Sequence, residues 1–209
     1  MNNPSSRKIE GNGANWPIVI MSTAAGVTAA MQVGKASVAL PLLRDEFGVG
    51  VAQLSLYLSF LSLSAALFGS VLGLFTLRIG PGRAGHIGLT CLCVGSLIAA
   101  VAPSWPVLMA GRLVEAIGLP LVVSAMPAIV QVNSNGRDRV LAMGLWSTWL
   151  PLGIAIAMLI AVFWIDRIGW RGLFVVSAAI SLLAAMGLAR MLSHGRTAAF
   201  PASIEKNRS

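Results

Sequence analysis

The segment "GRLVEAIG" (residues 111–118) places an arginine and a glutamate three residues apart inside an apolar run that extends from 106 to 131. In a helix, Arg112 and Glu115 would lie on the same face. A charged side chain at the centre of a membrane helix costs about 2.5–3.5 kcal/mol on insertion scales. Because such residues are tolerated where they face a partner or a polar cavity, this segment indicates a membrane helix with a buried polar site.

The composition of the whole chain supports a membrane protein. Of its 209 residues, 56% are hydrophobic and only 11% are charged, and the mean hydropathy is +0.82. Soluble domains carry about 25% charged residues, so this chain cannot cover a water-exposed surface. The net charge of +8 does not indicate nucleic acid as a partner, because the basic residues are scattered between apolar runs without an aromatic-interleaved basic face.

Apolar runs long enough to cross a bilayer predict an all-α membrane protein with six transmembrane helices. A spanning helix needs about 20 residues, and unbroken apolar runs favour helices over the alternating segments of a barrel. Glycine, proline, asparagine and aspartate mark the short links between them. We expect the first run to be a retained helix and not a secretory signal, because it is long and carries Gln32 and Lys35. The predicted spans are 16–40, 51–77, 84–103, 106–131, 139–164 and 171–190.

The distribution of lysine and arginine predicts the orientation. Ten of the fifteen lie in the N-terminal segment, the second and fourth links and the tail, whereas three lie on the opposite side and two lie within spans. The positive-inside bias then places both termini in the cytoplasm. We expect an inner or plasma membrane protein in contact with the lipid bilayer, with a cytoplasmic segment at 1–15, a helical bundle at 16–191 and a polar cytoplasmic tail at 192–209.

Three charged residues within the spans, Lys35, Arg112 and Glu115, are predicted to lie at similar depths in the outer half of the membrane. One interpretation is that Arg112 and Glu115 form a structural pair while Lys35 extends to the outer headgroups. The other is a polar cavity between the first and fourth helices, to which Gln32 contributes. Its net charge would be +1 with Glu115 ionised and +2 with it protonated, which suits an anion or a proton-coupled substrate with Glu115 as the titrating group.

The fifth span contains "GLWSTWLPLG" (144–153). Trp146 and Trp149 share one helix face, and Pro151 and Gly153 predict a kink or a gate, since a proline removes a backbone donor. The tryptophans either pack among the helices and lipids or face the polar cavity, because an indole N–H in mid-membrane prefers a polar partner.

Catalytic and metal sites are not expected. Cys91 and Cys93 stand in an apolar run without a second pair or a nearby histidine and are interpreted as packing residues. The sequence has no histidine–carboxylate metal spacing and no nucleophile–base arrangement. We therefore expect no enzyme activity, no metal and no cofactor.

Several motifs, taken together, resemble the N-terminal half of a major facilitator superfamily transporter. "LGLFTLRIGPGR" (72–83) is similar to the family's Gly-x-x-x-Asp-Arg-x-Gly-Arg loop, and "GRLVEAIG" to its Arg-x-x-Gln-Gly-x-Gly pattern in the fourth helix. "WLPLG" (149–153), "GWRGLF" (169–174) and "GKASVALPLLRDEFGV" (34–49) resemble the fifth helix, the start of the sixth and the exit of the first. "QVGKASVALP" is loosely similar to the branch that includes cyanate and other small-anion carriers.

The chain also departs from the family pattern. In the loop, Gly73, Arg78, Gly80 and Arg83 carry the resemblance, but Leu77 stands in place of the aspartate and Pro81 in place of an arginine. That aspartate belongs to a charge relay that latches the two halves, so latching through this loop is in question. In the fourth helix, Glu115 replaces glutamine and Ala116 replaces glycine.

The resemblance implies a bundle of two inverted three-helix repeats, in which the first, second, fourth and fifth helices line a central cavity. It implies transport of a small solute by alternating access, with proton coupling as one option, and the opposite wall of the cavity would come from a second six-helix half or another copy of the chain. The alternative is a truncated or accessory membrane protein without transport activity.

Overall fold

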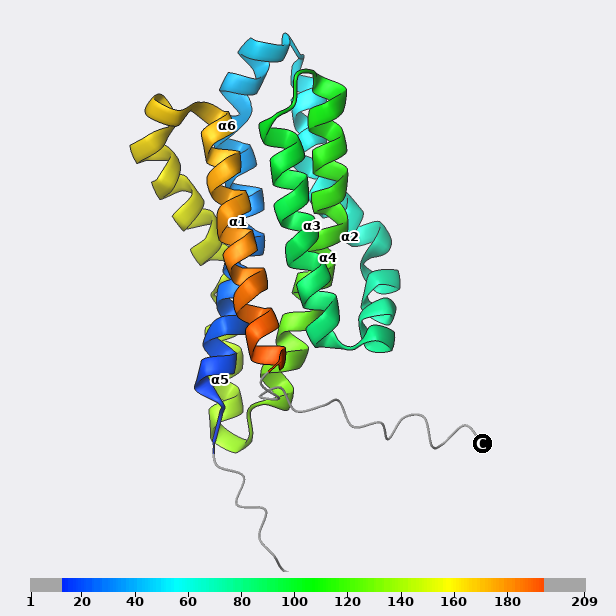
Figure 1. Cartoon of the computed structure of the whole chain (residues 1–209). Coiled ribbons are helices and arrows are strands. Elements are labelled where there is room, and N and C mark those ends of the chain that lie inside the picture. The colour runs from blue at the N-terminus through cyan, green and yellow to red at the C-terminus, as the bar shows by residue number, and fades with distance from the viewer. Residues whose placement is uncertain (1–12, 194–209) are drawn as a thin grey trace, which may run out of the picture.

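A computed structural model describes residues 13–193, and this part of the chain is helical throughout with no strand. Figure 1 shows long helices packed side by side in a bundle. Their mean hydropathy identifies five stretches that are long and apolar enough to cross a membrane, the last of which, Gly136–Met191, comprises α5 and most of α6. The helices are α1 (Trp16–Phe47), α2 (Val51–Ile79), α3 (Pro81–Ala100), α4 (Trp105–Val132), α5 (Gly136–Ser147) and α6 (Trp149–Ser193).

The last helix folds back on itself. Its 45 residues would extend about 68 Å if straight, more than twice the thickness of a hydrocarbon core. Gly169 interrupts the helical backbone with φ 64° and ψ −178°, a conformation that glycine adopts without steric cost. The two parts of α6 on either side of it run in opposite directions (Figure 1).

The first helix extends beyond its predicted end. Residue 40 is wrong as the boundary, because α1 continues through Pro41 to Phe47 and ends at Gly48 in the left-handed conformation, where the Gly48 N–H bonds to the carbonyl of Arg44. Proline is tolerated inside a membrane helix when the surroundings compensate for the lost hydrogen bond. The charged residues of "RDEF" (44–47), which lie between the predicted spans 16–40 and 51–77, therefore form the last turn of the helix.

The helix break predicted near Pro151 lies slightly earlier, at Thr148 between α5 and α6. Pro151 stands in the first turn of α6, where its missing N–H is not needed for an intrahelical bond. Gly153 serves packing instead of a kink. A side chain at this position would clash with the Val27 carbonyl and with Ala30, so the glycine allows α6 to approach α1 closely.

Glycines also bring α3 and α4 into close contact. A Cβ atom on Gly111 would lie 2.7 Å from the carbonyl oxygen of Gly95, and one on Gly118 would lie 2.7 Å from that of Gly88. Small residues at the same height on facing helices are the usual way for membrane helices to approach each other. This approach sets the distance between the two helices that flank the charged site.

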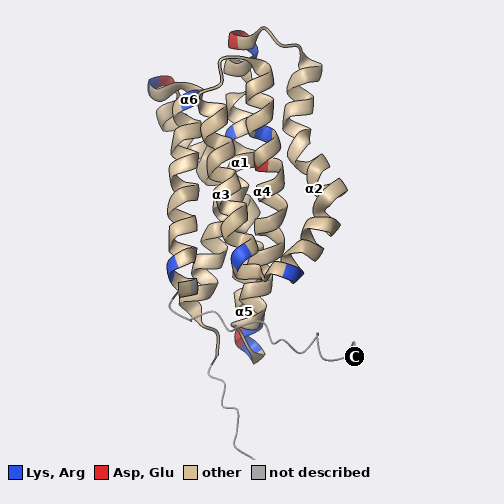
Figure 2. Ribbon diagram, turned by 45° about the vertical axis from the view of Figure 1, so that its right-hand side comes forward, with Lys and Arg blue, Asp and Glu red and all other residues tan. Residues whose placement is uncertain are grey.

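Burial differs strongly among the helices. Within its most apolar window α1 is 72% buried by the rest of the chain, whereas α2 is only 17% buried. Leu63, Leu67 and Phe68 are among the large apolar side chains that α2 exposes. Most of the described charged residues lie near the two ends of the bundle, and a small group lies on the helices between them (Figure 2).

We predict that Gly111→Ala lowers the free energy of unfolding by about 1–3 kcal/mol, the usual cost of overpacking a tight interior, because the added methyl group would meet the Gly95 carbonyl. Thermal unfolding of the purified protein in detergent measures this change. Gly144→Ala is the matched control, since a Cβ at that position meets no atom within 4 Å. Equal stability of the two variants would contradict the close approach of α3 and α4.

Candidate functional site

The candidate site is centred on Glu115, whose two carboxylate oxygens each bind one cation. Lys35 Nζ on α1 lies 2.6 Å from Oε1, and Arg112 Nη1, one turn earlier on α4, lies 2.9 Å from Oε2. The side chains are at most 1% exposed. One carboxylate therefore balances two buried cations, which leaves one excess positive charge if all three are ionised.

Uncharged polar groups extend this site across the bundle. Lys35 Nζ donates to Ser96 Oγ on α3 at 2.5 Å, and Gln32 Nε2 donates to Ser181 Oγ on α6 at 3.0 Å. Ser96 Oγ lies 3.1 Å from Gln32 Oε1 and 2.9 Å from Glu115 Oε1, and its single hydroxyl hydrogen can serve only one of them at a time. We call the set the central polar cluster: Gln32, Lys35, Ser96, Arg112, Glu115 and Ser181.

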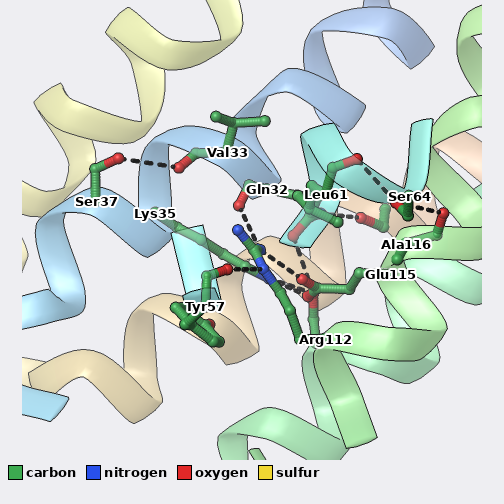
Figure 3. A network of polar contacts seen from close by, with 12 residues as sticks. Gln32, Val33, Lys35, Ser37, Tyr57, Leu61, Ser64, Arg112, Glu115 and Ala116 are labelled. Atoms are coloured by element: carbon green, nitrogen blue, oxygen red, sulfur yellow. Dashed lines mark hydrogen bonds and ion pairs between the residues drawn. The ribbon is translucent and has the colours of Figure 1, made fainter. Parts of the chain in front are cut away.

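Aromatic rings and backbone carbonyls complete the surroundings of the two cations. Figure 3 shows Gln32 and Tyr57 beside Arg112. Arg112 donates from Nε to the Tyr57 carbonyl at 3.3 Å and from Nη1 to the Gln32 carbonyl at 3.0 Å, and its Cζ lies 4.7 Å from the centre of the Tyr57 ring. Lys35 Nζ lies 4.3 Å from the centre of the Phe174 ring. Ring faces stabilise cations in desolvated positions.

Glycine makes room for the carboxylate. A Cβ on Gly95 would lie 2.7 Å from Glu115 Cγ and 2.7 Å from the carbonyl oxygen of Gly111. The absence of a side chain at residue 95 thus allows Glu115 to lie against α3 and lets the neighbouring Ser96 reach it. The local sequence "GS" at 95–96 therefore supplies both the space and one hydrogen-bond donor.

The structure decides between the two interpretations of Lys35. Its extension to the outer headgroups is wrong, because the side chain is 0% exposed and its ammonium binds Glu115. Gln32, Lys35, Arg112 and Glu115 come together from two helices, and Arg112 and Glu115 do pair. These four residues are enclosed by protein, so their role in lining a substrate cavity stays a prediction.

The two predicted tryptophans form a separate pair. Trp146 and Trp149 stack with ring centres 5.7 Å apart and an angle of 18° between their planes. Trp146 is buried against Gly26, where a Cβ would lie 2.6 Å from the indole ring. Trp149 instead lines an open groove of about 440 Å³ between α1, α2, α4 and α6, together with Val33, Leu61 and Leu119.

The predicted loop motif lies at the junction of α2 and α3. Arg78 is in the last turn of α2, and Gly80 joins the two helices with φ 87°, a value that favours glycine. Arg83 lies in the first turn of α3. A side chain at Gly73 would meet nothing within 4 Å, so packing inside this chain does not require that glycine. A role of these residues in gating stays a prediction.

Sequence reasoning missed an ionic contact at the opposite end of the bundle from this loop. Arg171 Nη1 lies 2.6 Å from Glu46 Oε1, and Trp170 Nε1 donates to Glu46 Oε2 at 2.6 Å. Arg171 Nη2 also donates to the Ala102 carbonyl at 3.0 Å. The end of α1, the α3–α4 link and the second part of α6 are joined there. The stretch "GWRGLF" (169–174) contains Trp170 and Arg171, but nothing in the sequence identified Glu46 as the residue that they bind.

Metal-binding geometry is not found among residues 13–193, where no three His, Cys, Asp or Glu side chains come close enough to hold an ion.

The sequence of the chain matches a known protein family over most of its length. The sequence profile of the Major Facilitator Superfamily matches residues 21–208. The chain belongs to this superfamily. The match covers all the helices that the structure describes from the second turn of α1 onward. The family and the long apolar helices together identify a multi-pass membrane protein.

Curated relatives give a second line of similarity. The chain is 25% identical over 184 residues to the Quinolone resistance protein NorB of Staphylococcus aureus strain JH9, and equally to the same protein of strains Newman and JH1. These matches cover 88% of this chain but only 39% of each relative. The chain thus spans about two-fifths of the length of these relatives.

We predict that Glu115→Gln destabilises the protein by about 3–5 kcal/mol, because it leaves two buried cations without a counter-charge. The double variant Lys35→Met/Glu115→Gln removes one cation as well and should be more stable than Glu115→Gln alone. Thermal unfolding in detergent measures both variants.

The matched control for this comparison is Glu46→Gln, which breaks an ion pair that is 37% exposed at the carboxylate and should cost no more than about 1 kcal/mol. Additive effects of Lys35→Met and Glu115→Gln would show that the two side chains are not coupled.

Proposed function

We propose that the chain is the N-terminal half of a secondary transporter that moves a small anionic solute across the cell membrane by alternating access. The observation that supports this most is the central polar cluster, which holds two cations against one carboxylate in the interior of an apolar bundle. Buried charges in membrane helices are expensive and usually mark a substrate or ion pathway. The excess positive charge favours an anion.

The proposed topology has six membrane crossings and both termini in the cytoplasm. Helices α1 to α4 supply four crossings, α5 with the first part of α6 supplies the fifth, and the part of α6 after Gly169 supplies the sixth. The reversal of α6 at Gly169 supports this count. In this proposal α1 to α3 form one repeat and α4 to α6 form the inverted second repeat.

The groove beside Trp149 is the proposed solute-facing surface of this half. It lies between α1, α2, α4 and α6, and these contain the first, second, fourth and fifth proposed crossings. Val33, which lines the groove, directly follows Gln32 of the central polar cluster along α1. The opposite wall would come from a second six-helix half or from another copy of the chain.

A second candidate is the export of an amphipathic aromatic compound. The groove of about 440 Å³ is lined mainly by apolar side chains and includes the indole of Trp149, a surface that suits a flat organic molecule better than an inorganic ion. The similarity to the Quinolone resistance protein NorB favours the same class. A quinolone carries a carboxylate, so the excess positive charge is compatible with both candidates.

Reconstitution into liposomes tests the transport proposal. The purified chain is inserted at high density, so that copies can pair, or together with a co-expressed second six-helix half. We predict saturable flux of formate, nitrate or cyanate that Arg112→Ala abolishes, because this variant removes one of the two cations of the cluster. Flux of a quinolone alone would support the second candidate.

The control for this assay is Arg167→Ala, which removes an exposed arginine of α6 outside the cluster, and membrane fractionation verifies insertion of each variant. Undiminished flux in Arg112→Ala would remove the cluster from the mechanism. Absence of flux in every preparation would favour an accessory membrane protein over a transporter half.

A further inference from the structure

The guanidinium of Arg112 is only partly used within the described chain. Its Nε–H goes to the Tyr57 carbonyl, and the two hydrogens of Nη1 go to the Gln32 carbonyl and to Glu115 Oε2. Nη2 is buried and has no hydrogen-bond partner among residues 13–193. Two charge-bearing N–H donors therefore point into the protein interior without an acceptor, although buried donors are nearly always satisfied.

The excess positive charge of the cluster lies on the same side chain, the guanidinium of Arg112. The Lys35 ammonium is engaged by Glu115 Oε1, by Ser96 Oγ and by the face of the Phe174 ring. Both oxygens of Glu115 are occupied. The nearby Tyr57 and Cys93 side chains are a neutral phenol and a neutral thiol and supply no counter-charge. The hydrogen-bond donors of the cluster that remain unused are thus those of Arg112 Nη2.

The guanidinium is held by helices that also line two grooves of the bundle. Its hydrogen bonds to the Gln32 and Tyr57 carbonyls fix it between α1 and α2. Val33 and Leu61, which follow these two residues along the helices, line the groove of about 440 Å³. Phe60 and Leu113 line a second groove of about 370 Å³ between α2 and α4. Arg112 itself lines neither groove, so a solute in either groove reaches Nη2 only after a local movement of α1 or α2.

We propose that Arg112 Nη2 is the recognition point for a small monovalent oxyanion or carboxylate, whereas Lys35 and Glu115 form an internal ion pair that does not contact the solute. The inference deepens the proposed function and rests on it for the solute's role, but the binding itself requires no transport. A planar guanidinium edge suits one oxygen of a carboxylate or nitrate. A water molecule would satisfy the N–H donors but would leave the excess charge uncompensated.

Equilibrium binding to the full chain in lipid nanodiscs tests this assignment with sodium formate and sodium nitrate as probes, at constant ionic strength maintained with gluconate. Tryptophan fluorescence and the midpoint of thermal unfolding report the binding. We expect saturable binding to the wild type and about 10- to 100-fold weaker binding to Arg112→Lys, which keeps the charge but lacks Nη2. Arg167→Lys, at an exposed position, should bind as the wild type does.

Equal affinity of the wild type and Arg112→Lys, or no saturable binding to the wild type, would overturn the proposal. If Arg112→Lys fails to fold, diffraction from wild-type crystals soaked in perrhenate, a monovalent oxyanion with an anomalous signal, gives the answer directly. An anomalous peak in contact with Arg112 Nη2 supports the site, and water or no density there overturns it. Binding without flux would refute the transport proposal alone, whereas flux without binding at Nη2 would refute this inference alone.

Discussion

Neutralising two cations with one carboxylate, in an interior enclosed by protein, is the constraint on which the rest of the structure depends. Glu115 can serve both Lys35 and Arg112 only if α1, α3 and α4 are close enough for their side chains to meet. The glycines at the α3–α4 contact provide that distance. Helix packing and electrostatics are therefore coupled in this bundle, because the close contact of the helices brings the buried charges within ion-pair distance of each other.

The same arrangement separates a rigid interior from the surfaces that can interact with other molecules. Lys35 and Glu115 are enclosed and saturated, and the contact between Glu46, Trp170 and Arg171 joins three segments at one end of the bundle. Outside this interior, α2 exposes large apolar side chains, and Trp149 lies on an open groove. In the proposed function, the solute meets the groove beside Trp149, and the central polar cluster supplies the positive charge.

Sequence predicted the charged residues of the site because the cost of a buried charge is large and does not depend on detailed geometry. Lys35, Arg112 and Glu115 stand out in apolar runs for this reason. Ser96 and Ser181 could not be identified in the same way, because single hydroxyls are common in membrane helices and usually bond to their own backbone. Helix ends were less predictable: charged residues can form the last turn of a helix, as in 44–47, and proline is tolerated within a membrane helix, as at Pro41.

The ionisation state of Glu115 in a bilayer tests the charge arrangement most directly. Isotope-edited infrared spectroscopy of the protein with ¹³C-labelled glutamate carboxyl groups, as the difference between the wild type and Glu115→Gln, isolates the signal of this side chain. The structure predicts the stretching bands of a carboxylate at neutral pH, because two cations bind its oxygens. The carbonyl band of a protonated acid at neutral pH would contradict a central ion cluster.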